Sequence, residues 1–329
     1  MLGSGSADCI IEAPDAVDRS TYSITQWTGS AKTIDAIIGV NTAGTVNIDG
    51  FKIDGRDTGP NNFYGVCFFD TDGSITDCVI DNVTYSAVPG TSSIVSLLAT
   101  HSLGATFTID ITGNTVPIFQ KGGIVLMGPG CSFTVNDNNV TGQASSSLAG
   151  NCIQLSYGAS GSTSGNYVEG TTYTGDDWAS TGILLFESGS VSMDGDEVYN
   201  CQSGVNFSDW GWVHVNPTPV NLDFSNLNLH SNEWTLGVQL SRDNSDVNLT
   251  VSNSSLLDNG GDGFDLWGTG SSSYYGGWSN GDFTAVITGC IITNSLYDGI
   301  WTADLSGNTN NTASIDRSED TRLNSSHRL

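Results

Sequence analysis

The chain has 329 residues with 9 Lys and Arg against 35 Asp and Glu, so its formal net charge is −26. Only 13% of its residues are charged, which argues against a helical bundle or coiled coil. The few basic residues argue against nucleic acid as a partner, and no apolar run approaches the ~20 residues of a membrane span. Because 37% of the residues are hydrophobic, including 8 Trp, 10 Tyr and 12 Phe, the sequence predicts a folded, acidic, β-rich protein.

The two ends of the chain differ from the rest in composition. No basic segment followed by an apolar core is visible at the N-terminus, so the sequence shows no signal peptide. Residues 317–329 hold three of the nine Lys and Arg and resemble translated sequencing-adapter read-through, familiar from metagenomic reading frames. We therefore expect one domain over residues 1–316, truncated at both ends, and a non-native tail over residues 317–329.

A repeat of about 30 residues runs through the chain and determines the predicted fold. Each repeat has an anchor residue of a type that tolerates a left-handed backbone, at Gly50, Asp77, Gly113, Asp137, Gly165, Gly195, Asn226, Asn253 and Gly289. Three positions after the anchors lie aliphatic residues: Ile53, Ile80, Val116, Val140, Val168, Val198, Leu229, Leu256 and Ile292. The alternation around each anchor is that of a strand with one buried face.

A second strand follows in each repeat and begins with glycine in most copies. These glycines are Gly65, Gly123, Gly182, Gly204, Gly237, Gly263 and Gly299, and Cys152 takes the same place in one copy. A single repeat cannot bury a face alone, so the repeats are expected to stack into a solenoid in which each strand pairs with its copy. Asn114, Asn138 and Asn166 each follow an anchor and predict a hydrogen-bonded ladder at a bend.

The segment 46–55 and the recurrent Gly-[Ile/Val]-x-[Leu/Phe] strand resemble the right-handed parallel β-helix of the pectin-lyase-like superfamily. The resemblance covers residues 9–310 and implies an all-β, right-handed parallel β-helix of about nine or more turns. It implies little about activity, because this fold hosts lyases, hydrolases, epimerases, tailspikes and adhesins. Of the motifs that polygalacturonases share, only Asp176-Asp177 occurs here.

The outward residues of the Gly strands suggest a polysaccharide groove. The first and third residues after the glycine are apolar, so the second and fourth should face outward. From residue 206 onward this outward set consists of amides, one carboxylate and indole rings, which suit the hydroxyls and apolar faces of sugars. We expect the groove over the Gly-strand sheet between residues 178 and 301, with substrate bound by Asn206, Gln239, Arg242, Trp267, Trp301, Trp210 and Trp178.

The earlier Gly strands have an outward set too apolar for a face in water: Phe69, Val125, Met127, Leu184 and Phe186. We expect either that a loop such as Val88–Thr106 folds over this surface, or that another copy of the chain packs there, as in a homo-oligomeric trimer.

The candidate catalytic residues are Asp265, Asp298 and Asp262, because glycoside hydrolysis needs two carboxyl groups on one face. Asp265 is favoured, since Asp262 and Asp298 each precede a glycine and would equally serve as Asx turns that open a strand. Glu169, Tyr199 and His230 share the fourth place after their anchors in three successive repeats. This spacing would gather an acid, a phenol and an imidazole on another face.

The sequence indicates no metal site or cofactor with certainty. Its seven Cys lack a CxxC pair, and we expect them to be buried small residues rather than disulfides. Residues 260–267 match one copy of a Ca²⁺-binding nonapeptide that normally occurs in tandem, a match that we attribute to chance. Carboxylate-rich turns would nevertheless suit loosely bound Ca²⁺.

Two functions stay open at this point. The first is an extracellular, cell-surface or virion β-helix that binds a polysaccharide and, if it is an enzyme, cleaves it as a glycoside hydrolase or polysaccharide lyase. The second is a non-catalytic structural or adhesive rod, such as a tailspike or surface-repeat segment. The acidity suggests a high-salt or marine setting and disfavours strongly anionic polymers as substrates unless Ca²⁺ bridges them.

Overall fold

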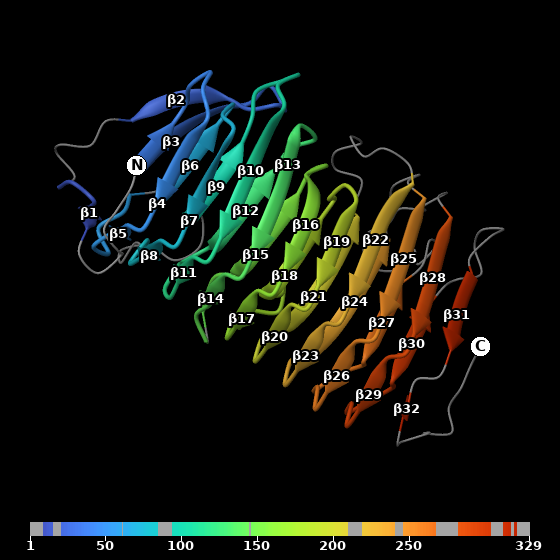
Figure 1. Ribbon diagram of the computed structural model, residues 1–329. Coiled ribbons are helices and arrows are strands. Elements are labelled where there is room, and N and C mark those ends of the chain that lie inside the picture. Colours follow the sequence, from blue (N-terminus) through green and yellow to red (C-terminus); the bar gives the residue numbers. More distant parts are fainter. Residues whose placement is uncertain are drawn as a thin grey trace.

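The computed structural model describes residues 9–15, 21–60, 62–84, 94–144, 146–209, 219–240, 246–267, 282–303, 312–316 and 319–320. Over these residues the chain forms strands β1 to β32 and no helix, so the described part has no helix able to cross a membrane. The strands stack along an elongated rod, with β1 at one end and β31 and β32 at the other (Figure 1). The predicted all-β parallel β-helix is confirmed.

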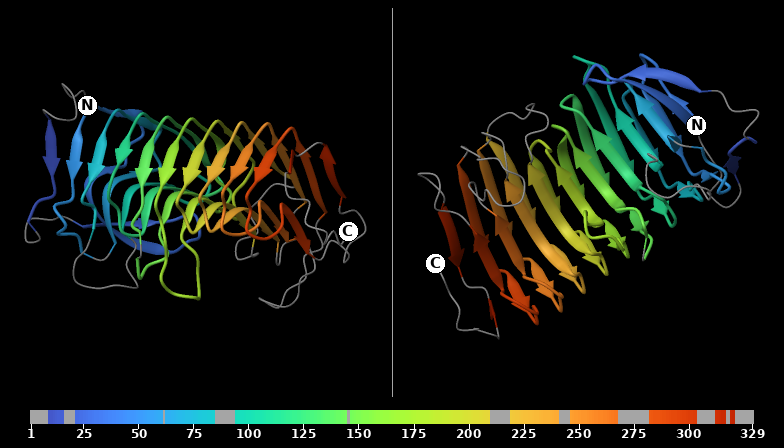
Figure 2. Two further views of the ribbon diagram at one scale, coloured as in Figure 1. Left: turned by 90° about the horizontal axis from the view of Figure 1, so that it is seen from below. Right: turned by 180° about the vertical axis from the view of Figure 1, so that it is seen from behind.

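Three sheets run along the rod, and each turn of the chain adds one strand to each of them. Sheet 1, seen from below in the left view of Figure 2, contains β1 (Ile10–Glu12), β5 (Lys52–Asp54), β8 (Val79–Asp81), β11 (Thr115–Val116), β14 (Asn139–Thr141), β17 (Tyr167–Glu169), β20 (Glu197–Tyr199), β23 (Asn228–His230), β26 (Ser255–Leu257), β29 (Ile291–Thr293) and β32 (Glu319–Asp320). Sheet 2 contains β4 (Val46–Asp49), β7 (Gly73–Thr76), β10 (Phe107–Thr112), β13 (Cys131–Asn136), β16 (Ser160–Ser164), β19 (Val191–Asp194), β22 (Val220–Ser225), β25 (Val247–Ser252), β28 (Phe283–Thr288) and β31 (Thr312–Asp316).

Sheet 3 contains β2 (Tyr22–Thr25), β3 (Ala31–Val40), β6 (Phe63–Phe69), β9 (Val95–Thr100), β12 (Gly122–Met127), β15 (Asn151–Ser156), β18 (Thr181–Phe186), β21 (Ser203–Asp209), β24 (Trp234–Leu240), β27 (Phe264–Trp267) and β30 (Ile300–Ala303). Every strand pair is parallel except β2 and β3, which are antiparallel. Sheet 1 strands are short, and the chain leaves them through the loops that lead into sheet 3.

All nine anchors have the predicted left-handed backbone, with φ from 49° at Asn253 to 70° at Gly113 and Gly195. Each anchor bends the chain from sheet 2 into sheet 1. The aliphatic residues three positions later lie in one buried interior row, in which Val140, Val168, Val198, Leu229, Leu256 and Ile292 are consecutive register partners. Burial of this row is the main apolar contribution of sheet 1 to the core.

The predicted asparagine ladder is present at this bend. Asn114 Nδ2 donates to Asn138 Oδ1 at 3.0 Å, and Asn138 Nδ2 donates to Asn166 Oδ1 at 2.9 Å. Asn166 Nδ2 then donates to Asp196 Oδ1 at 2.7 Å, so a buried carboxylate ends the ladder. Each rung also binds backbone groups, as in the 3.0 Å bond from Cys78 N to Asn114 Oδ1. The ladder therefore satisfies buried polar groups that the bend would otherwise leave without partners.

The glycines of the second strand let the backbone of sheet 3 approach the side chains of sheet 1. A Cβ at Gly65 would lie 2.8 Å from Ile80 Cγ2, and one at Gly123 would lie 2.7 Å from Val140 Cγ1. A Cβ at Gly263 would lie 2.7 Å from Ile292 Cγ2. These distances are too short for a side chain, so the interior row explains the glycine column.

The register of one strand corrects the sequence alignment. Gly237 pairs with Asn206 and Asp265, while Thr235, rather than Gly237, stands beside Gly204. Gln239 consequently pairs with Ser208 and Trp267, and not with Asn206 and Asp265 as the glycine template predicted. The sequence alignment matched glycine with glycine, whereas the observed register of β24 is the one that keeps its apolar side chains in the core.

The chain itself covers the apolar outer surface of the early sheet 3 strands. Ile24 of β2 and Ile34 of β3 are buried against Tyr64, Cys67, Phe69, Val95, Leu98 and Val125. The prediction that a loop at Val88–Thr106 covers this surface is wrong, because Val95–Thr100 is strand β9 of the same sheet. Leu184 and Phe186 of the predicted surface stay partly exposed, so the packing of a second copy of the chain there stays a prediction.

The segment expected to be a non-native tail carries part of sheet 1. Glu319 and Asp320 of β32 pair with Ile291 and Ile292 of β29. The other residues of 317–329 lie outside the described residues, so the domain boundary at 316 stays a prediction. The seven Cys are thiols rather than disulfides, and six of them are buried, as the sequence predicted.

Candidate functional site

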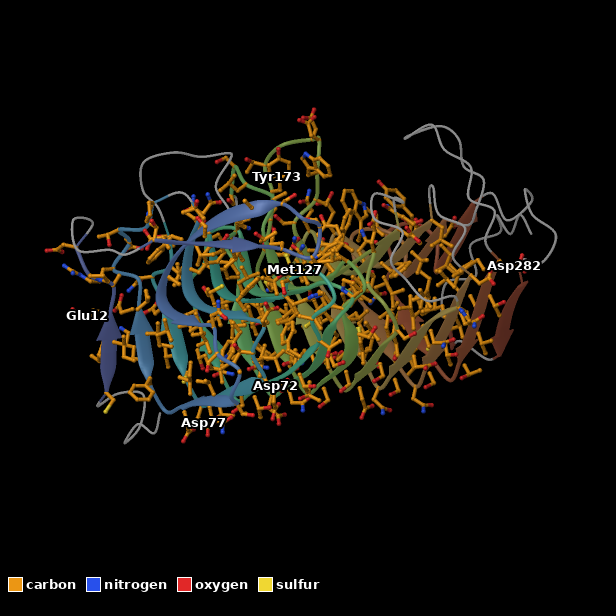
Figure 3. The ribbon with its side chains drawn as sticks, turned by 90° about the horizontal axis from the view of Figure 1, so that it is seen from above. Glu12, Asp72, Asp77, Met127, Tyr173 and Asp282 are labelled. Carbon is orange, nitrogen blue, oxygen red and sulfur yellow. The ribbon has the colours of Figure 1, made fainter. Side chains whose placement is uncertain are left out.

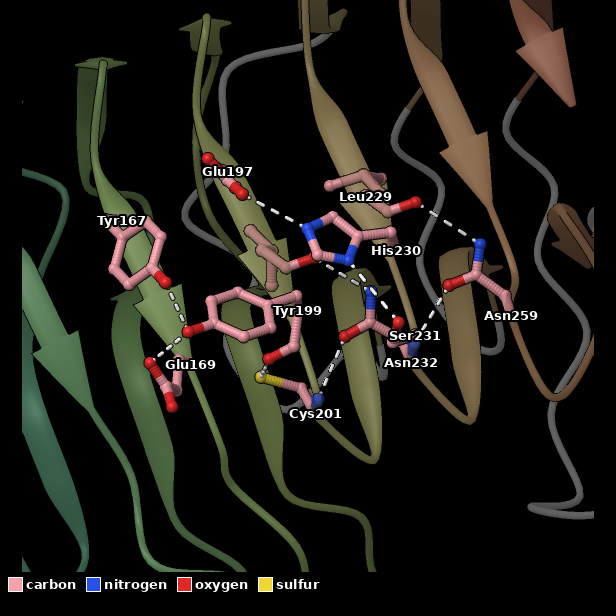
Figure 4. A network of polar contacts seen from close by, with 11 residues as sticks. Tyr167, Glu169, Glu197, Tyr199, Cys201, Leu229, His230, Ser231, Asn232 and Asn259 are labelled. Atoms are coloured by element: carbon pink, nitrogen blue, oxygen red, sulfur yellow. Dashed lines mark hydrogen bonds and ion pairs between the residues drawn. The ribbon is translucent and has the colours of Figure 1, made fainter.

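Five polar and aromatic side chains gather on the outer face of sheet 1, on the adjacent strands β17, β20 and β23 (Figure 4). We call them the Tyr–His cluster: Tyr167, Glu169, Glu197, Tyr199 and His230. All five are partly exposed. Sequence reasoning grouped three of them, and the structure adds Tyr167 and Glu197.

The three-residue strands explain why these side chains meet. The middle residues Val168, Val198 and Leu229 point into the core, so the residues on either side of them point outward. Register then places Glu169 beside Tyr199 and Tyr199 beside His230. Register partners lie about 4.8 Å apart across neighbouring strands, which brings the rings and carboxylates within contact distance.

Tyr199 is the centre of a chain of hydrogen bonds. Its hydroxyl donates to Glu169 Oε2 and also contacts the hydroxyl of Tyr167. Because the single phenolic proton of Tyr199 goes to the carboxylate, the Tyr167 hydroxyl must be the donor to Tyr199. Desolvation and the hydrogen bonds to Glu169 and Tyr167 raise the pKa of Tyr199 well above its usual value. Tyr199 is therefore a neutral proton donor at physiological pH.

His230 stacks on Tyr199, with ring centroids 5.0 Å apart and planes 15° from parallel. Its Nε2 lies 3.1 Å from Glu197 Oε1, and its Nδ1 lies 3.4 Å from the Ser231 hydroxyl. A carboxylate only accepts hydrogen bonds, so in a neutral ring Nε2 carries the proton and Nδ1 keeps a lone pair. The side chains of His230 and Glu197 are 28% and 38% exposed, which leaves the imidazole within reach of a ligand.

The surroundings of the cluster carry no positive charge from the described part of the chain. The described part of the chain contains four basic residues, and each of them contacts groups outside the cluster: Lys32, Lys52, Arg56 and Lys121. Within the same described residues, no three His, Cys, Asp or Glu side chains are grouped as metal ligands. The cluster itself consists of two phenols, two carboxylates and one imidazole.

Comparison with known proteins agrees with this architecture. A family model described as a right-handed β-helix region matches residues 102–278, which is more than half of the chain. The chain belongs to the right-handed β-helix family. No curated protein matches it.

Two solved structures are similar to the β-helix at low sequence identity. One is the crystal structure of the periplasmic alginate epimerase AlgG, with a TM-score of 0.41 and 11% identity over 83% of this chain and 69% of that one. The other is the A-module of the Azotobacter vinelandii mannuronan C-5 epimerase AlgE6, with a TM-score of 0.39 and 9% identity over 98% of this chain and 83% of that one.

The structure brings two of the proposed catalytic residues, Asp262 and Asp298, into contact, and the catalytic role proposed for them and for Asp265 stays a prediction. Asp262 and Asp298 lie at the corner where loops enter sheet 3, and the backbone N–H of Asp298 donates to Asp262 Oδ1 at 2.8 Å. Partial burial raises the pKa of the Asp262 carboxyl, and the hydrogen bond from Asp298 opposes this shift. This contact joins successive layers of the β-helix and differs from an Asx turn, in which the carboxylate accepts an N–H two residues further along its own segment.

Asp265 lies on the outer face of sheet 3, in one column with Asn206, Gly237 and Trp301. Gln239 lies in the neighbouring column with Ser208 and Trp267. The predicted binding residues Asn206 and Gln239 are thus diagonal rather than aligned, and Gly237 separates Asn206 from Asp265.

Several predicted groove residues cannot be placed by their side chains. Trp267 and Trp301 lie on β27 and β30, but their side chains are outside the described part. Trp210 and Arg242 lie outside the described residues altogether. Trp178 is described, is 51% exposed, and lies on the loop between β17 and β18. The groove over sheet 3 therefore stays a prediction.

Sequence reasoning missed Tyr167 and Glu197, although their spacing points to them. Both stand two places after an anchor, Gly165 for Tyr167 and Gly195 for Glu197. In a three-residue strand whose middle residue is buried, the second and fourth places after the anchor share one face. Glu169 and Tyr199 occupy the fourth place, so the alternation contains the complete cluster.

Proposed function

We propose that this β-helix protein binds a polysaccharide along the outer face of sheet 1 and hydrolyses it by acid–base catalysis at the Tyr–His cluster. The stacked contact between Tyr199 and His230, each with a carboxylate partner, carries this proposal. Cleavage of a glycosidic bond requires a base for the attacking water and an acid for the leaving oxygen. Since the substrate is an extended polymer, an extracellular or surface location is part of the proposal.

His230 is the proposed base. Glu197 accepts a hydrogen bond from Nε2 and orients the ring, so Nδ1 is free to take the proton of a water molecule that attacks the anomeric carbon. Its 3.4 Å contact with the Ser231 hydroxyl is long, and a water molecule can replace it at little cost. The nearby carboxylate then stabilises the imidazolium that forms.

Tyr199 is the proposed acid. Its O–H turns from Glu169 to the glycosidic oxygen and gives that oxygen its proton as the bond to the anomeric carbon breaks, and the Tyr167 hydroxyl stabilises the phenolate that remains. The proton on His230 returns to Tyr199 after the sugar product leaves. Because the raised pKa makes Tyr199 a weak acid, we expect slow turnover compared with hydrolases that use a carboxylic acid.

Hydrolysis fits the charge of the site better than elimination does. Elimination acts beside a uronate carboxylate, whose charge must be neutralised, and the described part of the chain brings no Lys or Arg to the cluster. Glu169 and Glu197 would repel such a substrate. An uncharged polysaccharide meets no such penalty.

The test is product formation from a panel of purified polysaccharides: xylan, glucomannan, mixed-linkage glucan, arabinan, alginate and polygalacturonate. We expect new reducing ends from at least one uncharged polymer, and none when Tyr199→Phe and His230→Phe are combined. Ser192→Ala, at an exposed position on the outer face of sheet 2, is the control and should act like the native protein. Unsaturated products from a uronate polymer would contradict hydrolysis, and no product from any polymer would contradict catalysis.

A further inference from the structure

Exposed aromatic rings line the corner between sheet 1 and sheet 3, next to the Tyr–His cluster. Trp178 is 51% exposed, Trp234 is 43% exposed and Tyr297 is 67% exposed. We call these three residues the aromatic ridge. Large exposed aromatic side chains in a row mark a contact surface rather than a random scatter.

The three rings follow a regular spacing along the axis of the β-helix. Trp234 is in the column of Thr181 and Ser203, and the column continues through Asp262 to Asp298. Trp178 lies three residues before Thr181, on the loop that leads into that layer, and Tyr297 directly precedes Asp298. The layers that carry the three residues, those of β18, β24 and β30, are therefore two strand spacings apart, which is about 10 Å. This advance is close to the length of two linked pyranose rings in an extended chain.

Local contacts hold the Trp234 ring and the loop that carries Trp178. The indole of Trp234 lies against the next layer, where a Cβ at Gly261 would be 2.9 Å from Trp234 Cδ1. The loop that carries Trp178 contains Tyr173, labelled in Figure 3. Gln202 Oε1 accepts the backbone N–H groups of both Tyr173 and Ser180, at 3.1 Å and 3.0 Å. These contacts hold the indole of Trp234 and the backbone on both sides of Trp178 before a ligand binds, which reduces the entropy cost of binding.

The charge around the ridge selects the ligand. Asp176, Asp177 and Glu233 are exposed beside the rings, and Asp262 and Asp298 are partly exposed between them. Carboxylates accept hydrogen bonds from sugar hydroxyls but repel sugar acids. A surface of aromatic rings alternating with carboxylates therefore fits an uncharged polymer of pyranose rings.

We infer that the aromatic ridge binds an extended, uncharged polysaccharide that runs parallel to the axis of the β-helix. Only the Ser231–Glu233 turn separates His230 from Trp234, so such a chain would pass beside the column of Glu169, Tyr199 and His230. The inference rests on the proposed function, to which it adds the class and direction of the substrate.

Affinity electrophoresis of the full chain in gels containing glucomannan, xylan, polygalacturonate or chitosan tests this inference. At least one of the two uncharged polymers should retard the native protein. Trp178→Ala, Trp234→Ala and Tyr297→Ala should each weaken binding about tenfold. Leu103→Ala, at a position 79% exposed but away from the corner, is the control and should bind normally. With soluble oligosaccharides, affinity should rise with length and level off once one molecule spans all three rings.

The outcomes separate the ridge from the catalytic proposal. The inference would be overturned by ridge variants that have the same unfolding temperature as the native protein and still bind the polymer normally. Retardation of the native protein by polygalacturonate or chitosan alone would also overturn it. If the ridge holds, its variants should raise KM and leave kcat nearly unchanged. If the ridge variants lose binding but the native protein cleaves no polymer, the inference about the ridge is supported and the proposed hydrolase activity is rejected.

Discussion

The ring of Tyr199 lies nearly parallel to the ring of His230, with their centroids 5.0 Å apart, although 31 residues separate them in the chain. The contact exists because one turn of the β-helix brings the fourth position after Gly195 beside the fourth position after Asn226. Each ring has its own carboxylate, Glu169 for Tyr199 and Glu197 for His230. A donor and an acceptor of protons are thereby fixed side by side.

His230→Phe should separate the chemical role of the imidazole from its packing role. Phenylalanine keeps a flat ring against Tyr199 but cannot accept a proton, so kcat on the cleaved polysaccharide should fall about 100-fold. KM and the thermal unfolding temperature should change little. A variant that keeps more than half of the native kcat would remove His230 as the base.

The asparagine ladder should contribute strongly to stability. Asn138→Ala removes the acceptor of Asn114 Nδ2 and the donor to Ile111 O and Asn166 Oδ1, all of them buried. We expect the free energy of unfolding to fall by about 3 kcal/mol in urea titrations.

Asn248→Ala is the control for the ladder. Asn248 Nδ2 donates to Asn221 Oδ1 at 3.0 Å, also between adjacent layers, but on the exposed face of sheet 2. Its removal should cost less than about 0.5 kcal/mol. Equal losses in the two variants would show that burial of the ladder does not matter.

Asp196 should make stability depend on pH. Burial raises its pKa from 3.8 to about 6, against the hydrogen bonds from Thr163 and Asn166. Between these values the folded state binds more protons than the unfolded state, so the free energy of unfolding should fall as pH rises from about 4 to 6. The full penalty, about 3 kcal/mol, is reached above pH 6.

Asp196→Asn should remove this pH dependence. The amide oxygen can still accept from Asn166 Nδ2, so the ladder keeps its last rung without a buried charge. Urea titrations at pH 4, 5, 6 and 7 should show a flatter profile for the variant and a more stable variant at pH 7. Identical pH profiles for both proteins would exclude Asp196 as the titrating group.

The cover formed by β2 and β3 should keep the protein from associating through the apolar outer surface of sheet 3. Ile34→Asp places a charge where the native side chain is fully buried against Tyr64 and its neighbours. The variant should lose about 3 kcal/mol of stability, bind a hydrophobic dye and sediment as larger species. Ser23→Asp, exposed on β2, is the control and should sediment like the native protein.

The sequence was sufficient to predict the features that repeat. The anchors, the interior row and the Asn114–Asn138–Asn166 ladder depend on residue types that only one local geometry accommodates, namely a left-handed bend or a buried amide. Strand β9 was missed because it carries Ser96 where other copies carry glycine. The register of β24 was predicted wrongly for a related reason. Gly237 fits the glycine of the repeated pattern, but Thr235 is the residue that stands beside Gly204 in the neighbouring strand.

The candidate site was predicted only in part. Column spacing brought Glu169, Tyr199 and His230 together, but whether their side chains touch depends on rotamers and on the stacking of the layers, which a sequence pattern does not contain. The groove over sheet 3 was inferred from a concentration of tryptophans. Trp178 lies on the loop that leads into sheet 3 and whose backbone Gln202 holds, and its place in that groove stays a prediction.

The proposed donation of a proton by Tyr199 to the glycosidic oxygen is the step that can be tested most directly. Reducing-end release from the cleaved polysaccharide should be measured for native protein and Tyr199→Phe at matched polymer binding, with Tyr167→Phe alongside. We expect Tyr199→Phe to lower kcat at least about 100-fold with an unchanged KM, and Tyr167→Phe to lower it by about tenfold or less. A Tyr199→Phe variant that releases reducing ends at the native rate would contradict the assignment of this site as the catalytic centre.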